Sequence, residues 1–99
     1  MKFEWDERKE RSNRKKHGIG FSLATLIFND PNILSRRDTR EDYGEERWNS
    51  LGLPVPRRGV LLHVTHTYRE EEDGEDIVRI VSTRKATKGE RERYSRVLG

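Results

Sequence analysis

The sequence contains no cysteine, only three prolines, and few aromatic residues, which make up 8% of its 99 positions. Without cysteine the chain can form no disulfide and has no thiolate to act as a nucleophile or metal ligand. Its apolar runs are short, and no window approaches the ~20 apolar residues of a membrane span. The first residues, MKFEWDERKERSNRKKHG, also lack the apolar region of a secretory signal. We therefore expect a cytoplasmic protein that does not interact with a membrane.

Charge, in contrast, is abundant and unevenly distributed. Charged residues make up 39% of the chain and hydrophobic ones 30%, with 21 Lys and Arg against 18 Asp and Glu. Bases cluster at positions 8–17 and 84–93, and acids at 40–46 and 70–76. This grouping predicts basic surfaces suited to a polyanion and acidic loops that would repel one. The length allows a single domain over residues 1–99.

The first twenty residues predict a short strand followed by a surface helix. KFEW at positions 2–5 is typical of a strand, and Asp6 is expected to cap a helix over residues 7–16 that stops at Gly18. This helix has almost no apolar stripe. We therefore expect it to be held on the surface mainly by Trp5 before it and Ile19 after it.

A second helix is predicted in FSLATLIFNDP, residues 21–31. Ser22 is a plausible N-cap, with Phe21 and Leu26 placed as a hydrophobic staple. Leu23, Leu26 and Ile27 would share the face directed to the core. The helix should end before Pro31, because the residue that precedes a proline is disfavoured in the α region.

From residue 32 onward the hydrophobic period changes to two, which predicts four strands at 33–38, 46–52, 60–69 and 76–83. Their short connections favour an antiparallel meander. Thr87 and Glu90 have the spacing of a capping box, which predicts a last helix through Leu98. The predicted fold class is α+β, with a mostly antiparallel four- to five-stranded sheet, two N-terminal helices and a C-terminal helix.

The two strands at 60–69 and 76–83 should form a hairpin with unlike faces. A turn centred near Asp73 would pair Tyr68 with Val78, His66 with Ile80 and Val64 with Ser82. The face under the helices would then contain Val60, Leu62, Val64, Val78 and Ile80. The opposite, polar face would contain His63, Thr65, Thr67, Arg69, Arg79, Val81 and Thr83. A one-residue slip or bulge would instead move onto that polar face the residues Arg84, Ser82, Tyr68 and His66.

No group of residues has the spacing of a metal or cofactor site, and we expect neither. His63 and His66 are three apart on a strand and should point to opposite faces, while His17 lies elsewhere. A phosphate-binding glycine loop and a nucleophile elbow are also absent. The reactive side chains that remain suit RNA cleavage: arginines can bind and neutralise a phosphate, and Tyr, Lys, Glu or His can transfer protons.

Five segments resemble the BrnT-type toxins of bacterial toxin–antitoxin modules in order and spacing. They are FEWD at 3–6, KHGIGF at 16–21, EERWNSLG at 45–52, HTYR at 66–69 and RIVSTRKATKGERERY at 79–94. The resemblance implies a RelE-like fold and metal-independent endoribonuclease activity that inhibits translation and growth. It also implies a BrnA-like, DNA-binding antitoxin as partner, and contact with operator DNA only through the toxin–antitoxin complex.

The same resemblance implies which residues form the site. Arg79 and Arg84 would bind phosphate and stabilise the transition state, with Arg47 as a third positive group. By strand alternation Arg79 and Arg84 face opposite ways, so both reach one phosphate only if the strand ends or bulges between them. Residues placed at the substrate are Glu46, Tyr68, Arg69, Ser82 and Lys85. The proton-transfer group stays open among Glu46, His63, His66, Tyr68 and Lys85.

Two other functions are compatible with the same residues. A non-catalytic RNA-binding or regulatory module would use the basic face only to hold RNA, and a protein-interaction adaptor would use it to dock an acidic partner. Exposed arginines are ordinary surface groups in most proteins. Arg84 in particular could simply pair with Glu90.

Overall fold

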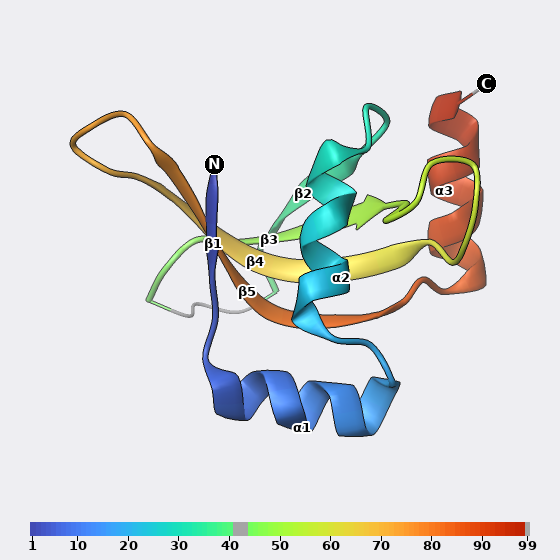
Figure 1. Ribbon diagram of the computed structural model, residues 1–99. Coiled ribbons are helices and arrows are strands. Elements are labelled where there is room, and N and C mark those ends of the chain that lie inside the picture. The colour runs from blue at the N-terminus through green and yellow to red at the C-terminus, as the bar shows by residue number, and fades with distance from the viewer. Residues whose placement is uncertain (41–43, 99) are drawn as a thin grey trace.

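A five-stranded sheet organises the chain in the computed structural model, which describes residues 1–40 and 44–98 (Figure 1). The strands are β1 (Lys2–Glu4), β2 (Leu34–Asp38), β3 (Arg47–Gly52), β4 (Leu62–Glu70) and β5 (Asp76–Lys85), in the spatial order β1-β5-β4-β3-β2. The helices are α1 (Glu7–His17), α2 (Phe21–Thr25), the 3-10 segment η1 (Leu26–Asn29) and α3 (Lys88–Leu98).

The predicted α+β class and the β2–β5 meander are confirmed, but the sheet is mixed. β1 pairs in parallel with β5, and the other three pairings are antiparallel. The connection from β1 to β5 runs through α1, α2 and the meander. This long connection allows the two strands to pair in parallel. The RelE-like relationship stays a prediction, and part of the acidic cluster at 40–46 lies outside the described residues.

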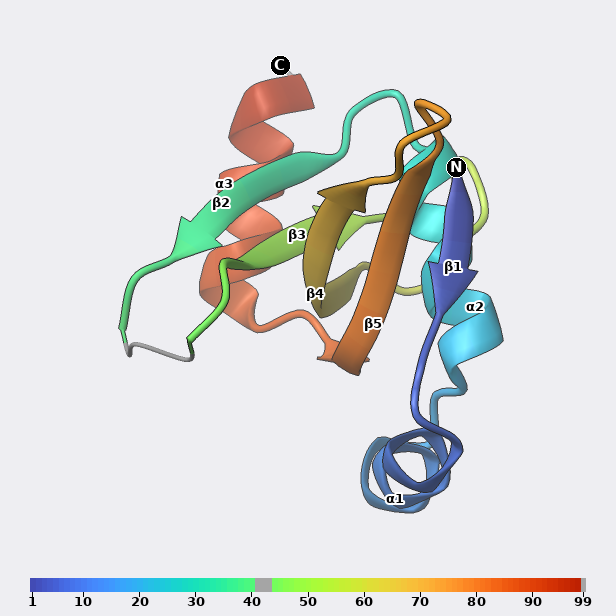
Figure 2. The same cartoon turned by 90° about the vertical axis from the view of Figure 1, so that its left-hand side faces the viewer.

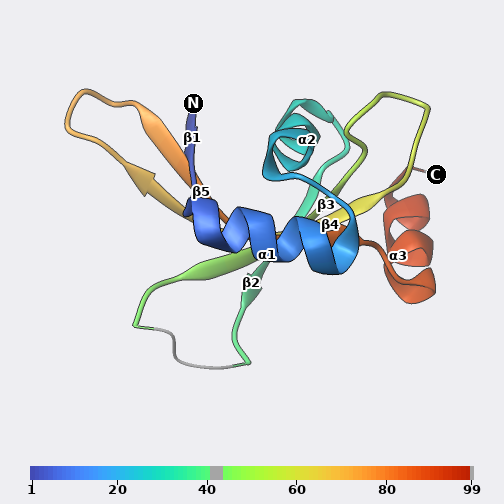
Figure 3. The same ribbon diagram turned by 60° about the horizontal axis from the view of Figure 1, so that its bottom comes forward.

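Helix α1 lies along the edge of the sheet beside β5, as Figures 1 and 3 show. Its predicted ends are confirmed: the Asp6 side chain accepts hydrogen bonds from the first-turn amides, and Gly18 ends the helix with φ 75°. Beyond Glu4, β5 has no strand partner on this side, and Asn13 fills that role. The Asn13 amide donates to the Thr83 carbonyl (2.9 Å) and accepts from the Thr83 amide (3.1 Å).

We expect Asn13→Ala to lower the free energy of unfolding by about 2 kcal/mol, because it leaves two backbone groups of Thr83 without partners. Urea denaturation measures this value. Ser12→Ala is the matched control, since Ser12 is the exposed neighbour on the same helix. Equal stability of the two variants would contradict this account of how α1 is attached.

The second helix differs from its prediction in both length and orientation. It is a short α-helix with Gly20 as its N-cap, without a side-chain cap, and continues as the 3-10 segment η1. Ser22 is therefore not the cap. Leu23 and Leu26 are 41% and 40% exposed, and the buried positions are Phe21, Ala24 and Ile27. The early start at Phe21 shifts the buried face, which packs against Leu62, Val64, Val78 and Ile80 of the sheet.

The hairpin of β4 and β5 contains a bulge, whereas the predicted pairing assumed regular alternation along both strands. Tyr68 pairs with Val78 and His66 with Ile80 as predicted, but the register shifts between Thr65 and His66. Val64 then pairs with Thr83 and not with Ser82. As a result Thr83 is buried, and Ser82 and Arg84 take the face of Thr65 and His63. Val60, predicted in the core, lies outside the strand and is 47% exposed.

Helix α3 stands at the far end of the sheet from the β4–β5 hairpin loop (Figure 1). The capping box is confirmed: the Thr87 amide donates to Glu90 (2.9 Å), and the Glu90 amide donates to the Thr87 hydroxyl (3.2 Å). Tyr94 anchors the helix, since it is buried with Leu51, Leu61 and Ala86. This placement brings Glu90 over the polar face of β4 and β5.

Candidate functional site

A basic hollow of about 540 Å³ opens between α1 and the sheet face opposite α2. Helix α1 contributes Lys9, Lys16 and His17 to its wall, and the sheet contributes Ser82 and Arg84. Among the described residues that line it there is no Asp or Glu. Figure 2 shows α1 below the end of β5. We call it the basic hollow; its charge suits an anionic ligand.

The bulge in β5 places Arg79, Ser82 and Arg84 on one face of the sheet. In register they lie opposite Thr67, Thr65 and His63 of β4, which alternate on that face. Arg79 and Arg84 are separated by four β4 residues, or about 13 Å at about 3.3 Å per residue. The two arginines therefore face the same side, and they are spaced to contact neighbouring phosphates of one strand more readily than a single phosphate.

Arg84 is held in place by α3. Its guanidinium donates to the two carboxylate oxygens of Glu90 at 2.7 and 3.0 Å, a fork geometry that fixes the plane of the group. The hydrogen bond from Arg84, against the effect of burial, lowers the pKa of Glu90 to about 2. The side chain of Arg84 is still 36% exposed, so it can meet a ligand.

His63 lies beside this ion pair and is 9% exposed. Its Nε2 is 3.8 Å from Glu90 Oε2, and its ring lines the basic hollow. Burial lowers the pKa of His63 below 6.5, and the positive charge of Arg84 lowers it further against the opposing effect of Glu90. The ring is therefore neutral at pH 7 and able to accept a proton.

A second hollow of about 300 Å³ continues from the first past His63 and Arg84 toward β2. Asp38 organises it: its carboxylate accepts from the Arg40 backbone amide and guanidinium, and Thr65 donates to Asn49 beside it. The hydrogen bonds from Arg40 are the main reason that the pKa of Asp38 is well below its usual range. Arg40 is not among the site residues predicted from the sequence, although an acid and a base two residues apart, Asp38 and Arg40, are visible there.

The other two predicted arginines lie on the same face but farther out. Arg47, at the start of β3, is 22% exposed and pairs with Glu45 at 3.6 Å. Arg69, near the end of β4, pairs with Glu4 and, at 3.5 Å, with Glu71. Arg69 does not line the basic hollow, and the carboxylates around it offset its charge.

Three more predicted substrate residues, besides Arg69, lie away from the basic hollow. Glu46 and Tyr68 line a separate, apolar pocket on the other face. Lys85 is exposed and follows Arg84, so strand alternation directs it to the face of Leu62. Of the candidates for proton transfer, His63 lines the basic hollow, whereas His66 belongs to the apolar pocket.

The described residues contain no group of three or more His, Asp or Glu side chains able to hold a metal ion. Their helices are also too short and too polar for any of them to cross a membrane.

Comparison with protein families gives a match that covers most of the chain. Residues 5–90 match the family described as "Ribonuclease toxin, BrnT, of type II toxin-antitoxin system". No curated protein matches the sequence. The matched range includes α1, α2, strands β2 to β5 and the capping box of α3, whereas β1 lies just before it. The chain therefore belongs to the BrnT family of ribonuclease toxins of type II toxin–antitoxin systems.

Proposed function

We propose that the protein is an endoribonuclease that cleaves RNA in the basic hollow without a metal ion. The observation that supports this best is the β5 bulge, which gives Arg79, Ser82 and Arg84 a common face with His63. A ribonuclease needs positive charge at the phosphate and a group that transfers protons, and this face offers both.

In the proposed reaction the 2′-oxygen of a ribose attacks the adjacent phosphorus, and the bond from phosphorus to the 5′-oxygen breaks. The products are a 2′,3′-cyclic phosphate and a 5′-hydroxyl end, so no water is consumed. One proton leaves the 2′-hydroxyl and one is delivered to the 5′-oxygen. The protein contributes by holding the strand in line and by stabilising the charge that develops on the phosphate oxygens.

Arg84 is the proposed stabiliser of that charge. Glu90 orients its guanidinium before RNA arrives, so little reorganisation is needed when the phosphate becomes more negative. Arg79 would hold a neighbouring phosphate, and Ser82 between them can donate a hydrogen bond. Lys9 and Lys16 of α1 would bind the RNA strand electrostatically along the opposite wall.

His63 is the proposed base, because it is neutral at pH 7 and lines the same hollow as Arg84. We expect His63→Ala to reduce the cleavage rate about 100-fold or more. The parent rate should fall in acid as His63 becomes protonated, with a midpoint below pH 6.5, and stay level above it. His17→Gln is the control, since His17 lines the same hollow on α1. An unchanged acid limb in His63→Ala would show that another group titrates.

The direct test is incubation of the purified protein with excess labelled RNA in EDTA. We expect several turnovers per protein molecule and products that end in 2′,3′-cyclic phosphate. Binding with intact RNA would instead favour the non-catalytic module, and activity that EDTA abolishes would refute metal independence.

The proposed biological role follows from this chemistry. Cleavage of cellular RNA in the cytoplasm would inhibit translation and growth, and a DNA-binding antitoxin would neutralise the enzyme by blocking access to the basic hollow. Contact with operator DNA would occur through the antitoxin.

A further inference from the structure

The face that carries α2 contains a second, chemically different pocket of about 430 Å³. Its wall is mainly apolar and aromatic, from Phe28, Ile33, Trp48 and Tyr68. Tyr68 is 48% exposed although it lies next to buried strand residues. An aromatic-lined hollow that stays open to solvent is typical of a site for an apolar anchor residue.

The floor of this pocket is rigid. His66 is 4% exposed, stacks edge-on against Phe28 at 4.9 Å, and its Nε2 lies 2.7 Å from the Ser50 hydroxyl. The other ring nitrogen is 3.3 Å from the Thr67 carbonyl, which can only accept, so Nδ1 donates and Nε2 accepts from Ser50. Ser35, at 2.7 Å, completes the chain by donating to Ser50. A fixed floor favours binding because little conformational freedom is lost when the pocket fills.

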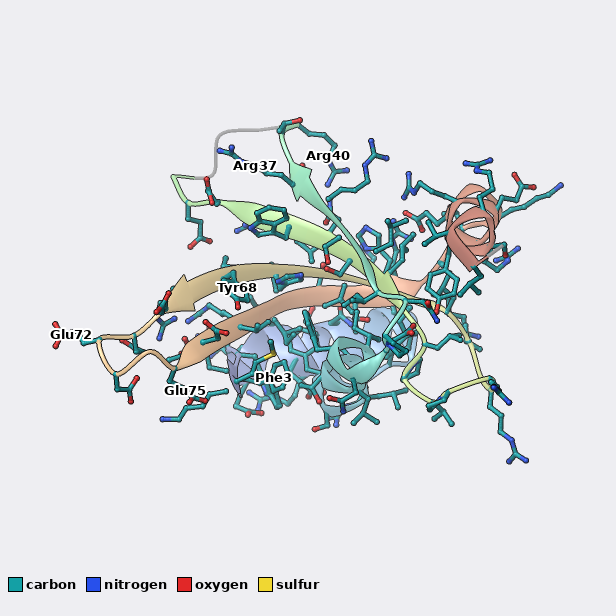
Figure 4. The ribbon with its side chains drawn as sticks, turned by 90° about the horizontal axis from the view of Figure 1, so that it is seen from above. Phe3, Arg37, Arg40, Tyr68, Glu72 and Glu75 are labelled. Atoms are coloured by element: carbon teal, nitrogen blue, oxygen red, sulfur yellow. The ribbon has the colours of Figure 1, made fainter. Side chains whose placement is uncertain are left out.

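The charge around this pocket is the reverse of the charge in the basic hollow. None of the described residues that line it is Lys or Arg; Glu46 on its rim pairs with Arg37 at 3.2 Å, and the Met1 ammonium pairs with Glu75 at 2.9 Å. The excess of negative charge beside the pocket therefore comes from the β4–β5 hairpin. Asp76, at the base of the β4–β5 hairpin, raises the pKa of the Tyr68 hydroxyl. Six of the seven residues from 70 to 76 are acidic. Figure 4 shows Glu72 and Glu75 on this hairpin, extending beyond Tyr68.

The negative charges of the hairpin favour a protein segment over RNA as the ligand of this pocket. Exposed aromatic rings can stack on RNA bases, but a phosphate backbone would be repelled by the acidic hairpin. A protein segment with an apolar or aromatic anchor and flanking Lys or Arg residues matches both the pocket and the hairpin. An antitoxin that binds DNA must carry such basic residues.

The sheet topology also links this pocket to the active site. β2 is an edge strand, and its residues alternate between the two faces. Ser35 lines the apolar pocket, whereas Arg36 and Asp38 line the hollow beside His63. A partner anchored in the pocket can therefore pass around β2 and cover the basic face.

We propose that this pocket, together with the acidic hairpin, is the anchoring site for a basic segment of the antitoxin. This inference rests on the proposed function, which supplies the partner. The antitoxin is held from the face opposite the RNA site and reaches the RNA site around β2. Anchoring and inhibition then use different surfaces of the toxin.

The test uses the purified antitoxin encoded beside the toxin gene, with its affinity for the toxin measured by calorimetry. Tyr68→Ala should weaken binding at least about 10-fold, as expected for an anchor contact, and leave RNA cleavage unchanged. Glu72→Lys should weaken binding more at low salt than at high salt. Val97→Ala is the matched control, because Val97 is an exposed apolar residue on α3 and should bind normally.

Lys16→Ala separates this inference from the proposed function. It should slow RNA cleavage and change antitoxin affinity less than Tyr68→Ala does. Parent-like affinity of Tyr68→Ala, or a larger loss in Lys16→Ala, would overturn the anchoring site. If the parent cleaves no RNA but Tyr68→Ala still loses antitoxin, the proposed activity fails and the anchoring site stands.

Discussion

Arg84→Ala should lower the rate of RNA cleavage about 100-fold or more, the usual loss when one preorganised donor to a developing anion is removed. The reason is geometric. Glu90 holds the guanidinium at 2.7 and 3.0 Å beside His63, and no other side chain on β5 occupies that position. Single-turnover rates at saturating RNA measure the effect without a contribution from weaker binding.

Lys85→Ala is the matched control for Arg84→Ala. It removes the same charge one residue along the strand, but from the opposite side of the sheet. We expect at most a small loss of rate. Arg84→Lys should restore only part of the activity, because an ammonium cannot form the bidentate contact with Glu90. Equal losses in Arg84→Ala and Lys85→Ala would mean that net charge matters and the position of Arg84 does not.

The second large effect is a loss of stability in weak acid. Burial lowers the pKa of His66 to about 4, against 6.5 for an exposed histidine. Between these values the unfolded chain binds a proton at this residue and the folded chain does not, so stability rises with pH across this window. At about 1.4 kcal/mol per pH unit the full effect is about 3 kcal/mol. This stability is fully present above pH 6.5 and is lost as the pH falls toward 4.

Urea denaturation at several pH values from 4 to 7.5 measures this loss. His66→Gln should be less stable than the parent near neutral pH, but its stability should vary less between pH 6.5 and 4. Carboxylates with lowered pKa values, such as Glu90, act mainly below pH 4.5 and so outside this window. His17→Gln is the control. If the free energy of unfolding changed with pH equally in the parent and in His66→Gln, His66 would not be the residue responsible for the loss of stability.

Much of the fold was predictable because local signals agreed with tertiary packing. The Asp6 cap, the Gly18 stop and the Thr87–Glu90 capping box depend on neighbouring residues, and all three are confirmed. The error in α2 arose because Ser22 looked like a cap, while burial of Phe21 determined where the helix begins. The parallel pairing of β1 depends on contacts across the whole chain, which local patterns do not contain.

The candidate site was harder to predict because it depends on one bulge. Strict alternation separates Arg79 from Arg84, and the shift between Thr65 and His66 reunites them. Asn13 explains part of the difficulty. Its side chain forms hydrogen bonds with the backbone of Thr83 at the edge of β5, next to the bulge, although the two residues are seventy positions apart in sequence. Gly52 shows a similar long-range constraint, because a Cβ there would lie 2.7 Å from Ile27. The residue types of the candidate site could be predicted from the sequence. Which of these residues lie together depends on three-dimensional contacts.

The proposed RNA-binding surface is the face of the sheet carrying His63, Ser82 and Arg84. Its most direct test is NMR titration of the labelled protein with an RNA whose 2′-hydroxyls are methylated, which can bind but cannot be cleaved. We predict that the amide signals of His63, Thr65 and Ser82 shift while those of Trp48 and Tyr68 stay in place. Shifts confined to Trp48, Tyr68 and the acidic hairpin would contradict the account.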